Sequence, residues 1–469
     1  MNTLANYIDG SWSAPSGDVT IPVINPYTEE VIAQVFQSTR QDVDRAVSAA
    51  RAALPAWGAT PAELRAGMLE RLSEALTSRA DELAELVVRD LGSTLKTAQN
   101  VHIGLPAAVL AQQRDYLPLV EAEQTVGNSL IIREPVGVVA AITPWNYPLH
   151  QVVAKLGPAL VAGCTMVLKP SEVTPLIVRE FFALIDQVGF PPGVVNLVWG
   201  TGPVVGEMLA GHPGVDFVSF TGSTAAGRRV AELAGRHVTQ TSLELGGKSA
   251  SVVLPGAELE RAVRTTVASC FLNSGQSCNA MTRLLVSKEE YAAAVDLAVA
   301  AASKYSMGDP MDSDTRLGPV VSKQQQQRIL QMVSDAVEAG ATLAHGSRTA
   351  PRERGFFVSP TVLAGVTPGS FIEQNEVFGP VLSVIAYDGA DDAVAVANGT
   401  PYGLAAAVWA DSQETGSAFA RRLDAGMVDV NGGRYNSAAP FGGNKGSGYG
   451  RELGPFGVEE FLRLKTIQL

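Results

Sequence analysis

Apolar residues in the first quarter of the chain recur with the period of an α-helix. Positions 43, 46, 47, 50 and 54 are apolar at three- and four-residue steps, and similar spacing continues to position 76. This pattern places an apolar stripe along each segment and predicts amphipathic helices. Thr60-Pro61-Ala62-Glu63 has the order of a capping box with proline at the first helical position, so we expect a helix to begin there.

From residue 136 onward, short apolar runs alternate with helical patterns. Buried strands separated by helices favour right-handed crossovers and a parallel sheet, which is the outline of a dinucleotide-binding architecture. The predicted strands cover 136–142, 165–169, 194–198 and 215–220, and the predicted helices lie near 149–162, 174–188 and 202–211.

A second alternating set runs from about residue 249 to about 439, and a glycine-rich stretch follows at 440–454. Residues 462–467 then alternate between apolar and polar positions, as in an edge strand. Such a strand pairs with a neighbour, either in this chain or in another subunit. A chain of 469 residues is too long for one ordinary domain. We therefore expect an α/β protein with two large domains and a small third element.

Composition and charge exclude several classes of function. A net charge of −12 disfavours binding to nucleic acid. No apolar run reaches the roughly 20 residues of a membrane span, and the first residues lack a basic segment followed by an apolar one, so we expect a cytoplasmic protein. The three cysteines have no CxxC spacing and the five histidines are scattered, which predicts neither disulfides nor a metal site.

Three residues are candidates for chemistry, although each also has an ordinary structural interpretation. Cys278 follows the small residues of Asn273-Ser274-Gly275, which leave its thiol approachable, but a lone cysteine is more often a buried apolar residue. Glu244 lies two residues before the glycine pair that precedes Lys248, and its carboxylate can act as a general base. Alternatively, Glu244 lies in a solvated turn and forms an ion pair with Lys248. The Asn146 amide can donate to an oxyanion, or it can make an Asx turn between prolines.

The chain resembles the aldehyde dehydrogenase superfamily over essentially its whole length. Any one of the matching motifs is weak evidence, but their shared order makes coincidence a poor explanation. The motifs are PWNYP at 144–148, KPSE at 169–172, ELGGK at 244–248, GQSC at 275–278, NEVFGP at 375–380 and PFGGNKGSGYGRELG at 440–454.

The resemblance implies a Rossmann-type NAD-binding domain (1–116 and 136–246), an α/β catalytic domain (247–446) and a β oligomerisation or bridging element (117–135 and 447–469). It also implies that the Cys278 thiolate adds to an aldehyde and that Asn146 stabilises the oxyanion. Glu244 would then activate the water that hydrolyses the resulting thioester. The resemblance implies that Lys169 belongs both to the catalytic residues and to the residues that contact the cofactor. We expect no metal site, and we expect the chain to form a homodimer or a homotetramer.

The resemblance also implies a set of cofactor contacts. Glu172 would hold the adenosine ribose with Lys169, and its carboxylate would repel a 2′-phosphate, so NAD is expected as cofactor, with NADP as a weaker alternative. GTGPVVG, from 200 to 206, departs from the GxGxxG pattern by one residue and is poor evidence alone. The expected contacts are Ile142, Thr143, Pro144, Trp145, Lys169, Ser171, Glu172, Gly202, Gly206, Phe220, Gly222, Ser223, Leu245, Gly246, Gln325, Glu376 and Phe378.

The expected aldehyde is bulky and hydrophobic or aromatic, because Ala154 stands where many relatives carry a large aromatic residue. Arg434 would pair with a substrate carboxylate, or it is simply a solvated loop arginine. The residues expected to line the aldehyde tunnel, by analogy of position, are Tyr147, Gln151, Ala154, Ser277, Asn279, Arg434 and Tyr435.

Three other functions compete with this one. A CoA-acylating semialdehyde dehydrogenase would end in thiolysis and would not need Glu244 as a base for water. A catalytically silent structural relative is disfavoured by the intact Cys278, Glu244 and Asn146. A thiol acyltransferase or hydrolase would need a histidine partner, and the sequence has no recognisable motif for one.

Overall fold

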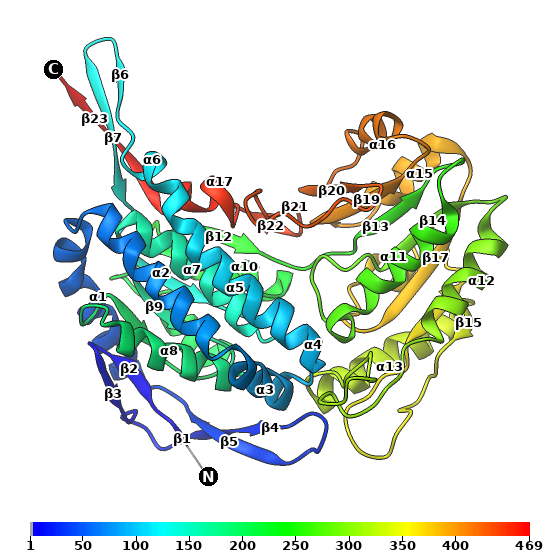
Figure 1. Cartoon of the computed structure of the whole chain (residues 1–469), viewed down its shortest axis with the longest axis horizontal. Helices are drawn as coiled ribbons and strands as arrows, with labels where there is room; N and C mark the ends of the chain where they lie inside the picture. The colour runs from blue at the N-terminus through cyan, green and yellow to red at the C-terminus, as the bar shows by residue number, and fades with distance from the viewer. Residues whose placement is uncertain (1–2) are drawn as a thin grey trace.

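The computed structural model describes residues 3–469. It contains two large sheets that lie side by side, each covered by helices (Figure 1). The first sheet, with strands in the order β22-β12-β11-β8-β9-β10-β2-β3, is parallel from β12 to β10. Its strands are β2 (Asn6–Ile8), β3 (Ser11–Ser13), β8 (Val138–Ile142), β9 (Thr165–Lys169), β10 (Val195–Leu197), β11 (Phe217–Thr221), β12 (Gln240–Glu244) and β22 (Gly448–Tyr449).

The central strands of this sheet read as continuous apolar runs because both faces are buried. In β8, Val138, Ala140 and Ile142 join the core on one face, whereas Val139 and Ala141 join the core on the other. Alternate side chains of a strand point to opposite faces, so a strand between two helical layers is apolar throughout. The parallel sheet expected from the sequence is confirmed.

Helices cover both faces of the first sheet. They are α1 (Arg40–Gly58), α2 (Ala62–Ser78), α3 (Ala80–Leu91), α4 (Leu95–Thr97), α5 (Leu105–Ala111), α6 (Leu117–Val120), α7 (Pro148–Ala162), α8 (Leu176–Val188), α9 (Glu207–Ala210) and α10 (Thr224–Gly235). The helix expected at 202–211 begins instead as a π-helical turn, η3 (Gly202–Gly206), and continues as α9.

The expected capping box at Thr60 is wrong. Helix α2 begins at Ala62 with Pro61 as its N-cap and has no side-chain capping bond. The Thr60 hydroxyl instead donates to the carbonyl oxygen of Ala56 at 3.0 Å, which closes the end of α1. This contact turns the Thr60 side chain back toward α1, and its oxygen accepts no hydrogen bond from the first turn of α2.

The second sheet has the order β15-β16-β17-β14-β13-β19-β20 and is parallel except at β15. Its strands are β13 (Ala250–Val253), β14 (Arg283–Ser287), β15 (Thr342–His345), β16 (Thr361–Ala364), β17 (Val381–Tyr387), β19 (Ala405–Trp409) and β20 (Met427–Val430). Its helices are α11 (Leu259–Phe271), α12 (Tyr291–Ala302), α13 (Lys323–Glu338), α14 (Phe371–Gln374), α15 (Gly389–Asn398) and α16 (Gln413–Ala420).

A narrow antiparallel arm projects from the first half of the molecule (Figure 1). It consists of β6 (Gln124–Val126), β7 (Ser129–Pro135) and the C-terminal β23 (Leu462–Gln468), with β7 in the middle. The alternating C-terminal segment is therefore an edge strand that pairs with β7 of its own chain. Residues 448–459 lie elsewhere, because β22 extends the first sheet and α17 (Gly454–Glu459) contacts α7.

Smaller elements complete the fold. A three-stranded sheet contains β1 (Thr3–Leu4), β4 (Thr20–Ile24) and β5 (Val31–Phe36), and β18 (Tyr402–Gly403) pairs with β21 (Asn444–Lys445). A short π-helix, η1 (Ala98–Gly104), and two short 3₁₀-helices, η2 (Gln112–Tyr116) and η4 (Leu272–Gly275), lie between these elements. Within residues 3–469, no helix combines the length and apolar character needed to cross a membrane.

Candidate active site

The carboxyl ends of the parallel strands meet the loop that carries Cys278. Strands β8, β9, β11 and β12 run in one direction, so the segments that follow them gather at one edge of the sheet, where ligands bind in such folds. A cavity of about 170 Å³ lies there. Its lining residues are Pro144, Trp145, Asn146, Gln151, Thr221, Gly222, Ser223, Leu245, Gly246, Cys278, Gln325, Arg328, Glu376 and Phe378.

Cys278 differs from the other two cysteines in its access to this cavity. The thiols of Cys164 and Cys270 are fully buried and donate to the carbonyl oxygens of Phe461 and Val381, which fits their interpretation as apolar core residues. Cys278 is only partly buried and faces the cavity. Burial raises the pKa of its thiol, and nearby carboxyl groups, Glu376 first, raise it further.

Asn146 approaches the Cys278 loop from the other half of the molecule. It lies between β8 and α7, is 3% exposed, and its Nδ2 donates to the carbonyl oxygen of Gln276 at 3.0 Å. An amide nitrogen carries two protons, so one remains for a ligand in the cavity. The next residue, Tyr147, hydrogen-bonds through its hydroxyl to Ser277 Oγ and stacks on His102 at 5.1 Å between ring centroids.

Glu244 is the last residue of β12, where it pairs in register with Thr221 and precedes Leu245; both of these neighbours line the cavity, but Glu244 does not. It is 2% exposed, and neither carboxylate oxygen has a hydrogen-bond partner among the described residues. The alternative ion pair to Lys248 is not present, since the Lys248 ammonium is also buried without a partner. Burial raises the pKa of Glu244 well above its ordinary value. Such a carboxyl is a suitable general base near neutral pH.

A buried ion pair lies next to Glu244. The Lys155 ammonium, on α7, donates to Glu452 and to Thr221 Oγ1, the latter at 2.6 Å. The charge of Glu452 raises the pKa of Glu244, and the charge of Lys155 lowers it. Sequence reasoning missed this pair, although Lys155 is the one Lys, Arg, Asp or Glu in the mostly apolar stretch from 148 to 162, which was a signal for it.

The residues expected at the adenosine side lie beyond the lining of this cavity. Lys169 ends β9, is buried, and pairs with Glu172 at 3.3 Å, while the Glu172 side chain is 20% exposed. A Cβ added to Gly206 would lie 3.8 Å from Lys169 Cδ and 3.9 Å from Ile142 Cγ2, so the turn at 202–206 lies against the end of the sheet. Phe220 packs under Gly222, where an added Cβ would lie 2.5 Å from the ring.

A second group of expected cofactor residues forms the opposite wall of the cavity. Glu376 accepts from the backbone N–H of Gly247 at 3.1 Å, and burial raises its pKa to about 7. A Cβ on Gly246 would lie 2.5 Å from Glu376 Oε2, so only glycine permits this approach. Gln325 Nε2 donates to the Phe378 carbonyl oxygen at 2.9 Å, which fixes this wall to helix α13.

The remaining expected cofactor residues are placed less directly. Trp145 meets the Phe378 ring edge-on at 5.3 Å, and Ser223 caps α10 by accepting from Ala226. Thr143, Ser171 and Gly202 do not line the cavity. Arg328 does, and sequence reasoning missed it, because an arginine on a polar helix face carries no local signal.

The residues expected to line an aldehyde tunnel fall into two groups. Tyr147, Gln151 and Ala154 lie one helical turn apart at the start of α7, but only Gln151 lines the cavity itself, and Ala154 is 1% exposed and belongs to the main core. Ser277 and Asn279 flank Cys278 in the sequence. Arg434 is exposed and forms no ion pair within residues 3–469, which matches a solvated loop arginine. The partly exposed Tyr435 has its pKa raised by desolvation and by nearby charges that include Cys278.

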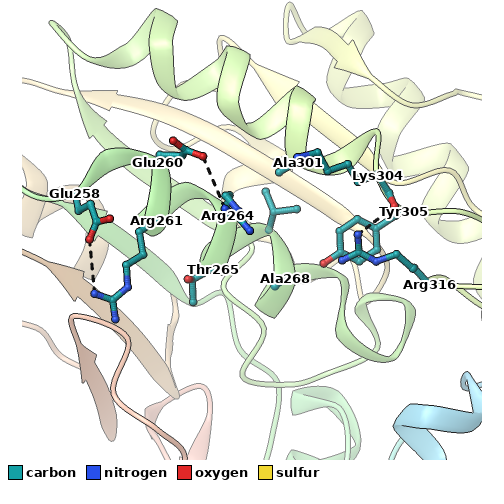
Figure 2. A pocket seen from close by; sticks show the side chains of 11 residues that line it. Glu258, Glu260, Arg261, Arg264, Thr265, Ala268, Ala301, Lys304, Tyr305 and Arg316 are labelled. Atoms are coloured by element: carbon teal, nitrogen blue, oxygen red, sulfur yellow. Dashed lines mark hydrogen bonds and ion pairs between the residues drawn. The ribbon is translucent and has the colours of Figure 1, made fainter. Parts of the chain in front are cut away.

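A larger hollow of about 650 Å³ lies on the outer side of α11, away from this chemistry (Figure 2). Its charged side chains include Arg264 and Lys304, and Arg316 lies over the Tyr305 ring at 4.5 Å. Neither Cys278 nor any other proposed catalytic residue lines it. The hollow is therefore a charged surface groove and not the reaction site.

Comparison with known proteins identifies the family and agrees with the fold. The Aldehyde dehydrogenase family matches residues 12–467, and the chain belongs to this family. A 3-succinoylsemialdehyde-pyridine dehydrogenase from Pseudomonas sp. is 42% identical, over 98% of this chain and 97% of that protein.

Solved structures give the same result. A mutant of aldehyde dehydrogenase C from Pseudomonas syringae, in complex with NAD+ and octanal, is 44% identical with a TM-score of 0.98, over 99% of this chain and 96% of that one. An aldehyde dehydrogenase from Bacillus cereus in complex with NAD+ is 36% identical with a TM-score of 0.97, over 100% of this chain and 96% of that one. The expected family and fold are confirmed.

Proposed function

We propose that this protein oxidises an aldehyde to its carboxylic acid with NAD, through a thioester on Cys278. The overall reaction consumes aldehyde, NAD+ and water and yields acid, NADH and a proton. The observation that carries the proposal is the meeting of a partly exposed thiol, a buried amide donor and a buried, unpaired carboxyl group at one edge of a parallel sheet.

The first half of the reaction rests on Cys278 and Asn146. The Cys278 thiol gives up its proton to a neighbouring carboxylate, its sulfur adds to the aldehyde carbon, and the carbonyl oxygen becomes an oxyanion. The free N–H of Asn146 donates to that oxygen, and losing one such donor costs on the order of 3–4 kcal/mol in the transition state. Loss of hydride from the same carbon leaves a thioester, which stores the acyl group on sulfur.

The cavity suits the nicotinamide end of NAD. Gly246 leaves room for the carboxylate of Glu376, which has one backbone donor and can accept from ribose hydroxyls. At the other end, the partly exposed Glu172 is available to a 2′-hydroxyl and disfavours a 2′-phosphate. When bound, NAD supplies the electron acceptor and a positively charged ring near the thiol. The relatives from Pseudomonas syringae and Bacillus cereus that were solved with NAD+ support this assignment.

The second half of the reaction rests on Glu244. No hydrogen bond within residues 3–469 holds its carboxylate, so turning the side chain toward the thioester, where it takes a proton from the attacking water, breaks none. Water adds to the acyl carbon, the C–S bond breaks, and the sulfur leaves as thiolate. The adjoining Lys155–Glu452 pair offers the proton a route away from the cavity.

The proposed substrate is a bulky hydrophobic or aromatic aldehyde. The choice rests on the analogy of position at Ala154, which is small where many relatives carry a large aromatic residue; Ala154 itself is buried in the main core and does not line the cavity. The names of two relatives agree with it, since one is named for a pyridine semialdehyde and the other was solved with octanal. A higher kcat/KM for acetaldehyde than for benzaldehyde-type substrates would contradict it.

The proposal is tested by NADH formation with a panel of aldehydes, with and without free CoA. We expect turnover without CoA, its loss in Cys278→Ala, and its retention in Cys164→Ala, which removes a buried thiol remote from the cavity. Turnover only with CoA would favour the CoA-acylating alternative. No turnover with any aldehyde would favour the silent structural relative.

We also propose that the chain forms a homodimer or homotetramer through the arm of β6, β7 and β23. One edge of β23 is unpaired within residues 3–469, and Leu464 on it is 68% exposed. An open edge with exposed apolar side chains favours pairing with another chain. Sedimentation of the protein with and without residues 462–469 tests this, and an unchanged mass would contradict it.

A further inference from the structure

The loop before Cys278 contains a left-handed turn. Asn273, Ser274 and Gly275 have φ angles of 52°, 56° and 75° in succession. This conformation is unfavourable for residues with a Cβ, so two consecutive non-glycine residues keep it only where the surroundings hold them. Gly275 has no alternative, because an added Cβ would lie 2.1 Å from the backbone carbon of Gly379.

Hydrogen bonds from three side chains hold this turn. Ser274 Oγ donates to the Gly318 carbonyl oxygen at 2.8 Å. Gln276 donates through Nε2 to the Asn273 carbonyl oxygen at 3.1 Å and accepts from the Val321 N–H at 2.9 Å. These bonds stay within the half of the molecule that carries Cys278.

The third side chain, Asn273, reaches the other half. Its Nδ2 donates to the backbone carbonyl oxygen of Asn146 at 2.9 Å, while Asn146 Nδ2 donates in return to the Gln276 carbonyl oxygen at 3.0 Å. All three side chains are at least 95% buried. Two crossed hydrogen bonds therefore fasten the segment bearing the oxyanion donor to the segment bearing the nucleophile.

We propose that Asn273 is a positioning residue that sets where the Asn146 amide lies relative to the sulfur of Cys278. Asn273 touches no reacting atom. It acts through the backbone of Asn146, and the left-handed turn is the conformation that aims its amide across the gap between the two halves. This inference rests on the proposed function, because it assigns Asn146 the role of oxyanion donor.

The test uses Asn273→Gly, which keeps the left-handed backbone and removes the side chain, with Ser274→Gly as a matched control. The control also keeps the backbone but removes a bond that does not reach Asn146. Because a displacement of about 1 Å at a reacting centre costs about 10²-fold in rate, we expect Asn273→Gly to lower kcat about 10- to 100-fold. We expect Ser274→Gly to change kcat less than about threefold.

A double-mutant cycle separates positioning from mere support of the fold. Asn146→Ala alone should lower kcat about 10²- to 10³-fold. Adding Asn273→Gly to it should lower kcat by less than about twofold more, since the donor being positioned is gone. The rate at which iodoacetamide alkylates Cys278 needs no oxyanion donor and should stay within about threefold of wild type in Asn273→Gly.

Independent, multiplying effects in the cycle would overturn the proposal, as would a parallel loss of alkylation rate. If Asn273→Gly does not fold, Asn273→Asp carries the same test, because it keeps the shape, tolerates positive φ and replaces the donor with an acceptor. A wild-type protein that oxidises no aldehyde would refute the proposed function and this inference with it. An active wild type with a multiplicative cycle would refute this inference alone.

Discussion

Replacement of Glu244 by glutamine separates the two halves of the proposed reaction. The substitution keeps the size of a side chain that is 2% exposed, and it breaks no hydrogen bond because neither carboxylate oxygen has a partner in residues 3–469. The loss is therefore that of a base. General-base catalysis contributes about 10²- to 10⁴-fold, or about 3–5 kcal/mol, so kcat should fall by that factor.

The assay is rapid mixing of enzyme, NAD and aldehyde with detection of NADH. Glu244→Gln should form about one NADH per subunit at a rate close to that of wild type and then stop, because the thioester persists. Hydroxylamine, a nucleophile that needs no base, should restore turnover. Glu207→Gln, which removes a surface carboxylate paired with Arg229, serves as the control and should behave as wild type.

The reasoning fails if Glu244→Gln keeps its steady-state rate, or if it loses the first turnover together with the later ones. Stability gives an independent check. The folded-state pKa of Glu244 is raised by burial, so the folded protein resists ionising it. Wild type should therefore lose stability as pH rises above the ordinary glutamate pKa of about 4.3 and toward the raised value, and the variant should lose less.

Three further predictions concern the cofactor and the substrate. Burial raises the pKa of Glu376 to about 7, so its carboxylate forms as pH rises through that value. The Kd for NAD, measured by titration of protein fluorescence, should therefore fall between about pH 6 and 8 in wild type but not in Glu376→Gln. Glu172→Gln should improve kcat/KM for NADP relative to NAD by about tenfold, and an unchanged ratio would remove Glu172 from the ribose site. Ala154→Phe should lower kcat/KM for bulky aromatic aldehydes at least about tenfold and spare acetaldehyde, and equal losses for both would show that Ala154 does not shape the pocket.

Much of the first sheet was predictable because its strands are buried on both faces. Residues 165–169 are apolar or small at almost every position, and β9 has those bounds. Helix ends were harder, since the Thr60 side chain turns back to a carbonyl of the preceding helix and accepts nothing from the following one. The π-helical start of 202–206 likewise has no period that distinguishes it from an α-helix in so short a segment.

The sequence by itself determined the family and the order of the elements, and it singled out three candidate groups for the proposed chemistry, because these depend on residue types at short spacings. Only the tertiary structure decided how those groups interact. It placed the ion pair of Lys155 and Glu452, which are 297 residues apart, beside Glu244. It also brought the side-chain amides of Asn146 and Asn273 into hydrogen bonds that join the two halves of the molecule. The pKa of a carboxyl group and the direction in which an amide points depend on burial and on long-range contacts. A residue and its neighbours along the chain do not determine burial or long-range contacts.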